Sequence, residues 1–240
     1  MRIAVVSDVH SNLPALDAVI EAAGEVDAWW HCGDIVGYGP HPNEVVERLR
    51  GLGARGVLGN HDAAALGSDI VEWFNPWAQE AAAWTARRIS PETRAWLEAL
   101  PDRLVLDGWT IVHGSARDPM EEYVTSESVA AATLAIVETV RSLNGHTHVP
   151  VAWRETAVSS EKRRPVYGEA LAFGPDRWLL NPGSVGQPRD RDPRASALVL
   201  DTTAGTATWL RVVYPIARTQ ADIRRAGLPA ILADRLSEGR

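Results

Sequence analysis

The chain has 240 residues, of which 45% are apolar and 23% charged, and this length is sufficient to bury one substantial core. A formal net charge of −7 disfavours an extended nucleic-acid face, because binding a polyanion requires clustered Lys and Arg. The single cysteine, Cys32, excludes an internal disulfide and disfavours a thiolate metal site.

The first 20 residues lack the features of an export signal. Asp8 and His10 directly follow a short apolar run, and no cleavage site of small residues comes after it. No segment approaches the ~20 uninterrupted apolar residues that a membrane-spanning helix needs. We therefore expect a cytoplasmic protein with no membrane partner.

Strands and helices alternate over the first 60 residues. Residues 2–7 form a short apolar run typical of a buried strand, and apolar residues at helical spacing follow over 12–23. The pattern continues with a strand over 26–32, a helix over 43–50 and a strand over 55–58. Strands that alternate with helices indicate a parallel sheet with right-handed crossovers.

The character of the chain then changes twice. Between residues 63 and 100 the composition shifts to Ala, Glu, Arg and Trp, with breakers at Asn75-Pro76 and Ser90-Pro91, which predicts two or three helices in a cap-like insert. Strand signals return at residue 104, and Asp107-Gly108 predicts a tight hairpin. One more helix is expected near 126–139, and the later strands are expected over 104–106, 109–113, 140–143, 149–153, 166–172, 177–180, 196–201 and 206–213.

The late strands are closely spaced and bounded by turns, which favours antiparallel hairpins in a second sheet. The polar stretch 155–164 is expected to be a solvated loop, and the amphipathic tail 219–240 to be helical and to pack on the rest. The fold class is therefore α/β, a four-layer α/β/β/α sandwich of two mixed sheets with outer helices. We expect residues 1–240 to form one domain that carries the 63–100 insert.

Two triplets place pairs of potential metal ligands directly after apolar segments. Asp8-Val9-His10 follows the first strand, and extended residues two apart project to the same side, so both side chains can reach one ion. His146-Thr147-His148 repeats this geometry. Either triplet alone is more often a helix cap with a surface histidine.

Other potential ligands lie where loops leave predicted strands, and these favour the metal site. The loops at the carboxyl ends of parallel strands converge on one crevice, so ligands that are scattered in sequence become neighbours. Five of the seven histidines occupy such strand ends. The additional residues at these ends are Asp34, Asn60, His61 and His113.

The potential ligands fall in five short sequence blocks. In chain order, these blocks resemble the motifs of the calcineurin-like metallophosphoesterases: Asp-x-His, Gly-Asp, Gly-Asn-His-Asp/Glu, a lone His and Gly-His-x-His. The resemblance extends from residue 1 to about 150. The run 33–40 and the later Asn181-Pro182-Gly183-Ser184 are similar to the compact bacterial phosphodiesterases of that superfamily and extend it to about 195. The matching blocks here are Asp8/His10, Gly33-Asp34, Gly59-Asn60-His61-Asp62, His113 and Gly145-His146-Thr147-His148.

The resemblance implies two divalent transition-metal ions with a bridging hydroxide as nucleophile. Mixed nitrogen and oxygen ligands suit Mn, Fe, Zn or Ni better than Mg or Ca. Among these ions we expect Mn. Two ions (+4), two aspartates (−2) and a hydroxide (−1) leave about +1, which a phosphodiester monoanion neutralises. One ion would be held by Asp8, His10 and His148, the other by Asn60, His113 and His146, with Asp34 bridging them.

The resemblance makes His61 the general acid that protonates the leaving oxygen, and the alternative is a capping or supporting histidine. Asp62, adjacent in sequence, is the predicted carboxylate that helps His61 to hold its proton.

Four residues are candidates for substrate contact. Asn60 lies among the ligands, and Tyr38 lies in the Gly/Pro-rich loop after Asp34, where a simple turn is an equal alternative. Ser184 and Arg189 follow a predicted strand, and the alternative for them is a solvated loop. The ten tryptophans are assigned to the core by default.

The expected function is hydrolysis of phosphodiesters, with cyclic nucleotides or small nucleotide-like diesters as substrates. The alternatives within this fold are a phosphomonoesterase and a pyrophosphohydrolase. A non-catalytic protein-binding scaffold is a more distant alternative, since the acid histidine is present, and the acidic charge disfavours a nuclease. The expected partner is thus a small phosphate ester.

Overall fold

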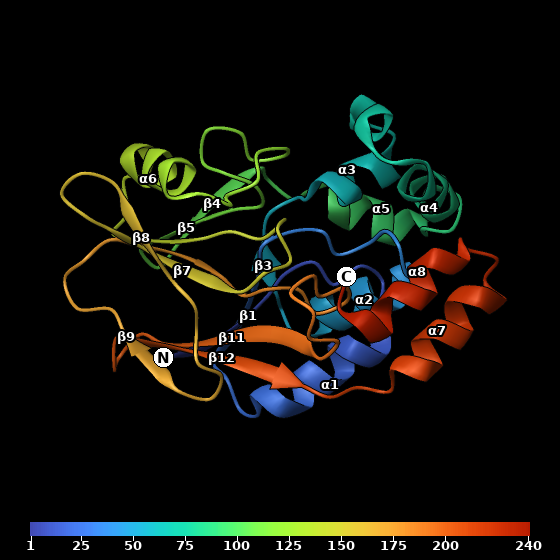
Figure 1. Ribbon diagram of the computed structural model, residues 1–240. Coiled ribbons are helices and arrows are strands. Elements are labelled where there is room, and N and C mark those ends of the chain that lie inside the picture. Colours follow the sequence, from blue (N-terminus) through green and yellow to red (C-terminus); the bar gives the residue numbers. More distant parts are fainter.

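The computed structural model describes residues 1–240 and contains two six-stranded sheets (Figure 1). The first sheet has the strand order β3-β2-β1-β11-β12-β9. Its strands β1, β2 and β3 are parallel, as predicted, and the other three pair antiparallel. The strands span Arg2–Val6 (β1), Ala28–His31 (β2), Arg55–Gly56 (β3), Ala170–Ala172 (β9), Ala195–Asp201 (β11) and Thr206–Val212 (β12).

The second sheet has the order β4-β5-β6-β10-β7-β8, with β5, β6 and β10 parallel at its centre. The hairpin expected at Asp107-Gly108 joins β4 to β5, and both turn residues have positive φ, as a two-residue type I′ turn requires. The strands span Arg103–Leu106 (β4), Trp109–Val112 (β5), Arg141–Leu143 (β6), Val151–Glu155 (β7), Ser160–Arg163 (β8) and Trp178–Asn181 (β10).

Helices cover the outer faces of both sheets, which confirms the four-layer sandwich. Figure 1 shows α6 over the second sheet and α1 beneath the first, with the remaining helices gathered at one end of the sheets. None of the helices is both long enough and apolar enough to cross a bilayer. They span Leu13–Ala23 (α1), Pro42–Gly51 (α2), Asn60–Leu66 (α3), Asp69–Trp73 (η1), Pro76–Ala86 (α4), Pro91–Glu98 (α5), Glu127–Ile136 (α6), Ile216–Arg225 (α7), Ala230–Asp234 (α8) and Arg235–Glu238 (η2).

Strand β1 shows how the sequence produces three buried layers. Its side chains alternate in direction, so Ile3 joins the core between the two sheets and Ala4 joins the core under α1 and α2. Because both faces are covered, the strand is apolar and buried after its first residue, Arg2. A separate hydrophobic cluster that includes Leu134 and Leu179 packs α6 against the second sheet.

The breakers in the 63–100 segment start helices. The Asn75 side chain accepts a hydrogen bond from the Ala78 amide, and the Ser90 hydroxyl accepts one from Thr93, so each residue caps the helix that follows. In both cases the next residue is proline, whose fixed φ suits the first helical turn. The segment therefore contains the end of α3, then η1, α4 and α5.

Two expectations for the late strands are wrong. The strands after residue 149 do not form one sheet, because β7, β8 and β10 join the second sheet and β9, β11 and β12 join the first. The polar stretch 155–164 is not only a loop, since residues 160–163 form the edge strand β8 against β7. Charged side chains are common on exposed edge strands, and because they are also common in loops, the sequence pattern did not indicate a strand here.

The C-terminal segment is helical, as expected, and packs against α4. Ile223 of α7 and Leu232 of α8 lie in one apolar cluster with Ala78 and Ala81 of α4 and with Tyr38. This contact brings residues 230–240 next to the loops at the carboxyl ends of the first sheet (Figure 1).

Candidate metal centre and adjoining pocket

The carboxyl ends of the parallel strands in both sheets meet at one place and bring the predicted ligands together. In the first sheet, Asp8, Asp34 and Asn60 follow β1, β2 and β3, and in the second sheet His113 and His146 follow β5 and β6. The loops are joined directly, since the His10 amide donates to the Asp34 carbonyl at 3.1 Å and the Gly145 amide to the His113 carbonyl at 2.8 Å. All seven predicted ligands are buried; we call them the ligand cluster: Asp8, His10, Asp34, Asn60, His113, His146 and His148.

Each carboxylate in the ligand cluster has one anchored and one free oxygen. In Asp8, Oδ2 accepts hydrogen bonds from the Ser7 hydroxyl and the His146 amide. In Asp34, Oδ1 accepts from the His61 amide at 2.8 Å. The other oxygens, Asp8 Oδ1 and Asp34 Oδ2, are buried without any hydrogen-bond partner. A buried charged oxygen left unpaired is costly, so a cation would stabilise both positions.

The four histidines of the cluster are oriented by main-chain carbonyls. His10 and His148 donate from Nδ1 to the carbonyls of Val36 and Gln187, and His113 donates from Nδ1 to Cys32. His146 uses the opposite nitrogen, donating from Nε2 to the Glu121 carbonyl. A ring nitrogen that donates its proton outward leaves the other with a free lone pair, which is how metal-binding histidines are held.

The free nitrogens converge on the free carboxylate oxygens. Asp34 Oδ2 lies 3.6 Å from His10 Nε2 and 3.4 Å from His113 Nε2, and His148 Nε2 lies 3.2 Å from Asp8 Oδ1. Two groups, each with ligand atoms within 4.8 Å of one another, could hold an ion: one is Asp8, His10, Asp34 and His148, the other Asp34, His113 and His146. Asp34 belongs to both groups, and the Asn60 Oδ1 atom lies 3.1 Å from His113 Nε2, beside the second. The donor set thus fits two ions that share one carboxylate.

The backbone at the ligand cluster adopts a conformation that most residues avoid. Asp8, His10, Asp34, His146 and His148 all have φ between 48° and 66°, in the left-handed region. Non-glycine residues are uncommon there and cost free energy to hold, and such positions gather at functional sites. Five among seven predicted ligands is a concentration that packing of an ordinary core does not explain.

Glycines allow the loops of the cluster to approach closely. A Cβ atom at Gly59 would lie 2.1 Å from Asp34 Oδ1, and a Cβ at Gly145 would lie 2.0 Å from the Ser7 hydroxyl that holds Asp8. Both positions therefore need glycine for space, whatever their backbone angles.

The pKa values of the histidines in the ligand cluster reflect its two buried carboxylates. Burial is the largest single influence and lowers the pKa of His113, but the Asp34 carboxylate, the Asp8 charge and the Cys32 carbonyl together outweigh it and raise that pKa to about 9. Burial lowers the pKa of His146 to about 3, so this imidazole stays neutral. In the absence of a cation, one proton on His113 partly compensates the two aspartates, a place that a metal ion can take.

His61 and Asp62 are both buried but their side chains have separate surroundings. The His61 ring packs between Phe74 and Tyr38, with centroids 4.4 and 4.3 Å away, and burial lowers its pKa to about 4. The Asp62 carboxylate accepts from the amides of Val36 and Gly59 instead of contacting the imidazole. Burial, then the Asp34 charge, raises the pKa of Asp62 to about 7. Asp62 thus holds two ligand loops together, a role that the sequence did not reveal.

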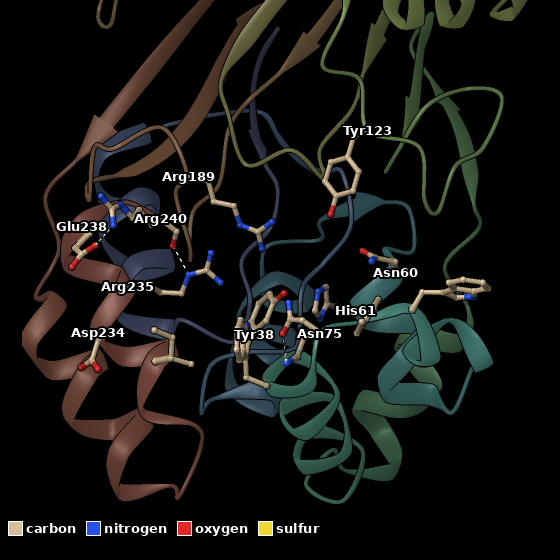
Figure 2. A pocket seen from close by; sticks show the side chains of 15 residues that line it. Tyr38, Asn60, His61, Asn75, Tyr123, Arg189, Asp234, Arg235, Glu238 and Arg240 are labelled. Carbon is tan, nitrogen blue, oxygen red and sulfur yellow. Dashed lines mark hydrogen bonds and ion pairs between the residues drawn. The ribbon is translucent and has the colours of Figure 1, made fainter.

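A cavity of about 450 Å³ opens beside the ligand cluster. Figure 2 shows Tyr38, Asn60 and His61 at its base, Arg189 and Tyr123 on one side, and Arg235 on another. Three of the four predicted substrate contacts, Tyr38, Asn60 and Arg189, therefore line one space.

The fourth, Ser184, lies elsewhere. Its hydroxyl is fully buried, donates to the Asp8 carbonyl at 2.8 Å and accepts from the Gln187 amide at 2.8 Å, so it supports the loop of Asp8.

Sequence reasoning did not predict the aromatic part of the cavity wall. Most tryptophans are core residues, as expected, but Trp73 and Trp77 are 83% and 43% exposed at this cavity. Neither has a sequence signal that separates it from the buried ones.

The fold and the ligand cluster define a phosphoesterase of the calcineurin-like class. The family description of the calcineurin-like phosphoesterase superfamily domain matches residues 1–205. The chain therefore belongs to this family.

Two similar proteins align over nearly the whole chain, and a third aligns over part of it. A crystal structure of a metallophosphoesterase from Sphaerobacter thermophilus is 45% identical with a TM-score of 0.92, and the alignment covers 100% of this chain and 99% of that one. An uncharacterized protein of Methanocaldococcus jannaschii is 34% identical over 99% of this chain and 98% of its own length. A symmetrical bis(5′-nucleosyl)-tetraphosphatase of Nitrosococcus oceani is 30% identical over 59% of this chain and 54% of its own length.

Proposed function

We propose that the chain is a two-metal phosphoesterase that hydrolyses phosphodiesters, namely cyclic nucleotides or small nucleotide-like diesters. The observation that carries the proposal is the convergence of four outward-anchored histidines on two buried carboxylate oxygens that lack partners. One ion would be held by Asp8, His10 and His148, the other by Asn60, His113 and His146, and Asp34 would bridge them. We expect Mn, with Fe, Zn or Ni as alternatives, in a cytoplasmic enzyme.

When bound, the ions supply an activated water and neutralise charge on the phosphoryl oxygens. The chain's own residues supply orientation and the proton. His61 lines the cavity next to Asn60, and its Nδ1 atom is buried against Gly37, which leaves Nε2 as the atom that can reach a substrate. Because the pKa of His61 is lowered to about 4, its ring is neutral at pH 7 without substrate. A bound phosphate anion raises this pKa, so the imidazole can take a proton from solvent and donate it from Nε2 to the leaving oxygen.

We also propose that the helical segment 63–100 acts as a cap within one domain of residues 1–240. Its contribution to the cavity supports this role, because Trp73, Phe74 and Trp77 lie on one wall. A second candidate function is hydrolysis of phosphoric anhydrides. It is favoured by two guanidinium groups of the cavity, those of Arg189 and Arg235, and by the name of the N. oceani relative.

The test is a panel of phosphate mono- and diesters assayed with Mn²⁺, with His61→Ala beside the wild type. Removing the acid should slow a diester with an alkyl leaving group by roughly 100-fold and a nitrophenyl diester much less, since nitrophenolate leaves without a proton. His41→Ala is the matched control, because this imidazole lies 3.5 Å from Asp222, outside the cavity. Equal losses on both esters would contradict the acid role, and a folded wild type without metal-dependent turnover would contradict the function.

A further inference from the structure

One wall of the cavity is formed by α8, η2 and the residues that follow, within 231–240, outside the 1–205 stretch that matches the family description. Arg235 and Arg240 of this segment lie across from His61, and Figure 2 shows the guanidinium groups of Arg189 and Arg235 in the same space. With His61 as the proposed acid, the space between His61 and this segment is where the leaving group departs. The C-terminal segment thus adds chemistry that the metal ligands do not determine.

The cavity contains two arginines that form no ion pair with an Asp or Glu side chain. Arg189 donates from Nη2 to the Gln187 side chain at 2.9 Å, and its Nε atom is buried without a partner. Arg235 donates from Nε to the main-chain oxygen of Arg240, and neither of its terminal nitrogens makes a hydrogen bond within the chain. Neither arginine forms a salt bridge. Two cationic groups in one half-buried space repel each other unless an anion lies between them.

The acidic residues nearby do not supply that anion. Asp234 accepts from Arg224 at 2.6 Å, and the Glu238 carboxylate lies 3.1 Å from the Arg240 guanidinium, so each has its own partner. In agreement, burial and then the charge of Arg189 lower the pKa of Arg235. The pair therefore has the character of a phosphate site that uses guanidinium groups.

The opposite wall is aromatic and open to solvent. Trp73 and Trp77 are 83% and 43% exposed, and Phe74 packs on His61. Exposed large aromatic side chains gathered at a cavity typically mark a binding surface. Any planar nucleobase can be stabilised by stacking on such a side chain. A volume of about 450 Å³ lies within the range of cavities that enclose small ligands.

We propose that this cavity is a leaving-group subsite for a nucleotide, in which the aromatic wall stacks the base and the pair Arg189/Arg235 binds a phosphate beyond the one that is attacked. The inference deepens the proposed function and rests on it for the placement of the attacked phosphate. A simple diester has a single anionic group, which the ligand cluster takes, and leaves the arginine pair unused. Inorganic polyphosphate satisfies the arginines but not the aromatic wall.

The test is calorimetric titration of the metal-loaded protein with ADP, adenosine and pyrophosphate. Arg235→Gln should weaken ADP binding by roughly 10-fold, the scale of one charged hydrogen bond, and adenosine binding by less than about 2-fold. Trp77→Ala should weaken ADP and adenosine together by roughly 5-fold or more and leave pyrophosphate unchanged. Arg225→Gln, at an exposed arginine paired with Asp222 outside the cavity, is the control and should change none of them.

Equal effects of Arg235→Gln on ADP and adenosine, or no effect on either, would overturn the subsite. If this variant does not fold, Arg189→Gln provides the same contrast from the loop that follows β10. The two proposals fail separately. Loss of the ADP–adenosine contrast with diester turnover intact removes only the subsite, whereas an intact contrast in a protein that turns over no diester removes only the proposed function.

Discussion

The ligand cluster and the wall of the cavity are adjacent but are built in opposite ways. The ligands come from strand ends of both sheets, are buried, and are held by main-chain groups on every side. The wall comes from η1, α4, α8 and η2, and its aromatic and cationic side chains reach into solvent with few partners. The rigid part serves a reaction on the phosphoryl group, which every phosphate ester shares, and the open part is where one ester can differ from another.

The comparison predicts the largest effect at the carboxylate that both candidate ion sites share. Asp34→Asn should lower metal-dependent turnover by roughly 100-fold or more, since even residues behind a metal ligand typically contribute 10–100-fold. Metal content by mass spectrometry and turnover should fall together. The fold should survive, because the amide oxygen of the new side chain can still accept from the His61 amide. Full metal content in the Asp34→Asn variant would contradict the shared site.

A purely steric change should reach the same cluster. In Gly59→Ala the new methyl group would lie 2.1 Å from Asp34 Oδ1, although the φ of −102° suits alanine. We expect metal affinity to fall by roughly 10-fold and stability by about 1–3 kcal/mol from overpacking. Gly51→Ala is the matched control, since a methyl group there meets open space. If both variants behave alike in metal titrations, the close approach of the loops does not matter.

The buried region should also be the acid-sensitive one. His31 lies in β2 with both ring nitrogens unpaired, and burial lowers its pKa to about 3. The unfolded chain binds a proton near pH 6.5 and the folded chain does not, so this contribution to stability is complete above pH 6.5 and decreases as the pH falls toward 3.

His31→Leu should therefore lose less stability between pH 8 and pH 5 than the wild type, by about 2 kcal/mol. Urea unfolding at both pH values measures the difference. Parallel pH dependences in the two proteins would show that His31 is not responsible.

The smallest effect on stability is expected at the wall. Trp73 is 83% exposed, so Trp73→Ala should change the free energy of unfolding by less than about 0.5 kcal/mol. If the wall binds the leaving group, KM for a nucleotide diester should still rise several-fold while KM for a nitrophenyl phosphate stays constant. A KM that changes equally for both substrates would separate Trp73 from substrate choice.

The same contrast explains how far the sequence could predict the site. The ligands were found because Asp8, Asp34 and His113 follow short apolar runs, and the topology of parallel strands brings such ends together. The order of the late strands could not be found, because hairpin signals fix pairing between neighbours and not the sheet that they join. β8 was missed because charged edge residues resemble those of a loop.

The C-terminal wall of the cavity was not predicted for another reason. Arg235 belongs to a short helical segment whose position depends on the apolar contact of α7 and α8 with α4, which lies far away in the sequence. The role of Asp62 also depends on tertiary structure, since its carboxylate reaches the Val36 amide across two loops. Local pattern carries no information on either contact.

The positive φ angles of the ligand residues set a limit on how stable this protein can become. A left-handed conformation costs a non-glycine residue roughly 1–2 kcal/mol, and glycine avoids that penalty. A glycine in place of His148 or Asp8 would relieve this penalty but remove a proposed metal ligand. The side chains at these positions thus cost backbone free energy, as a trade-off between stability and activity requires.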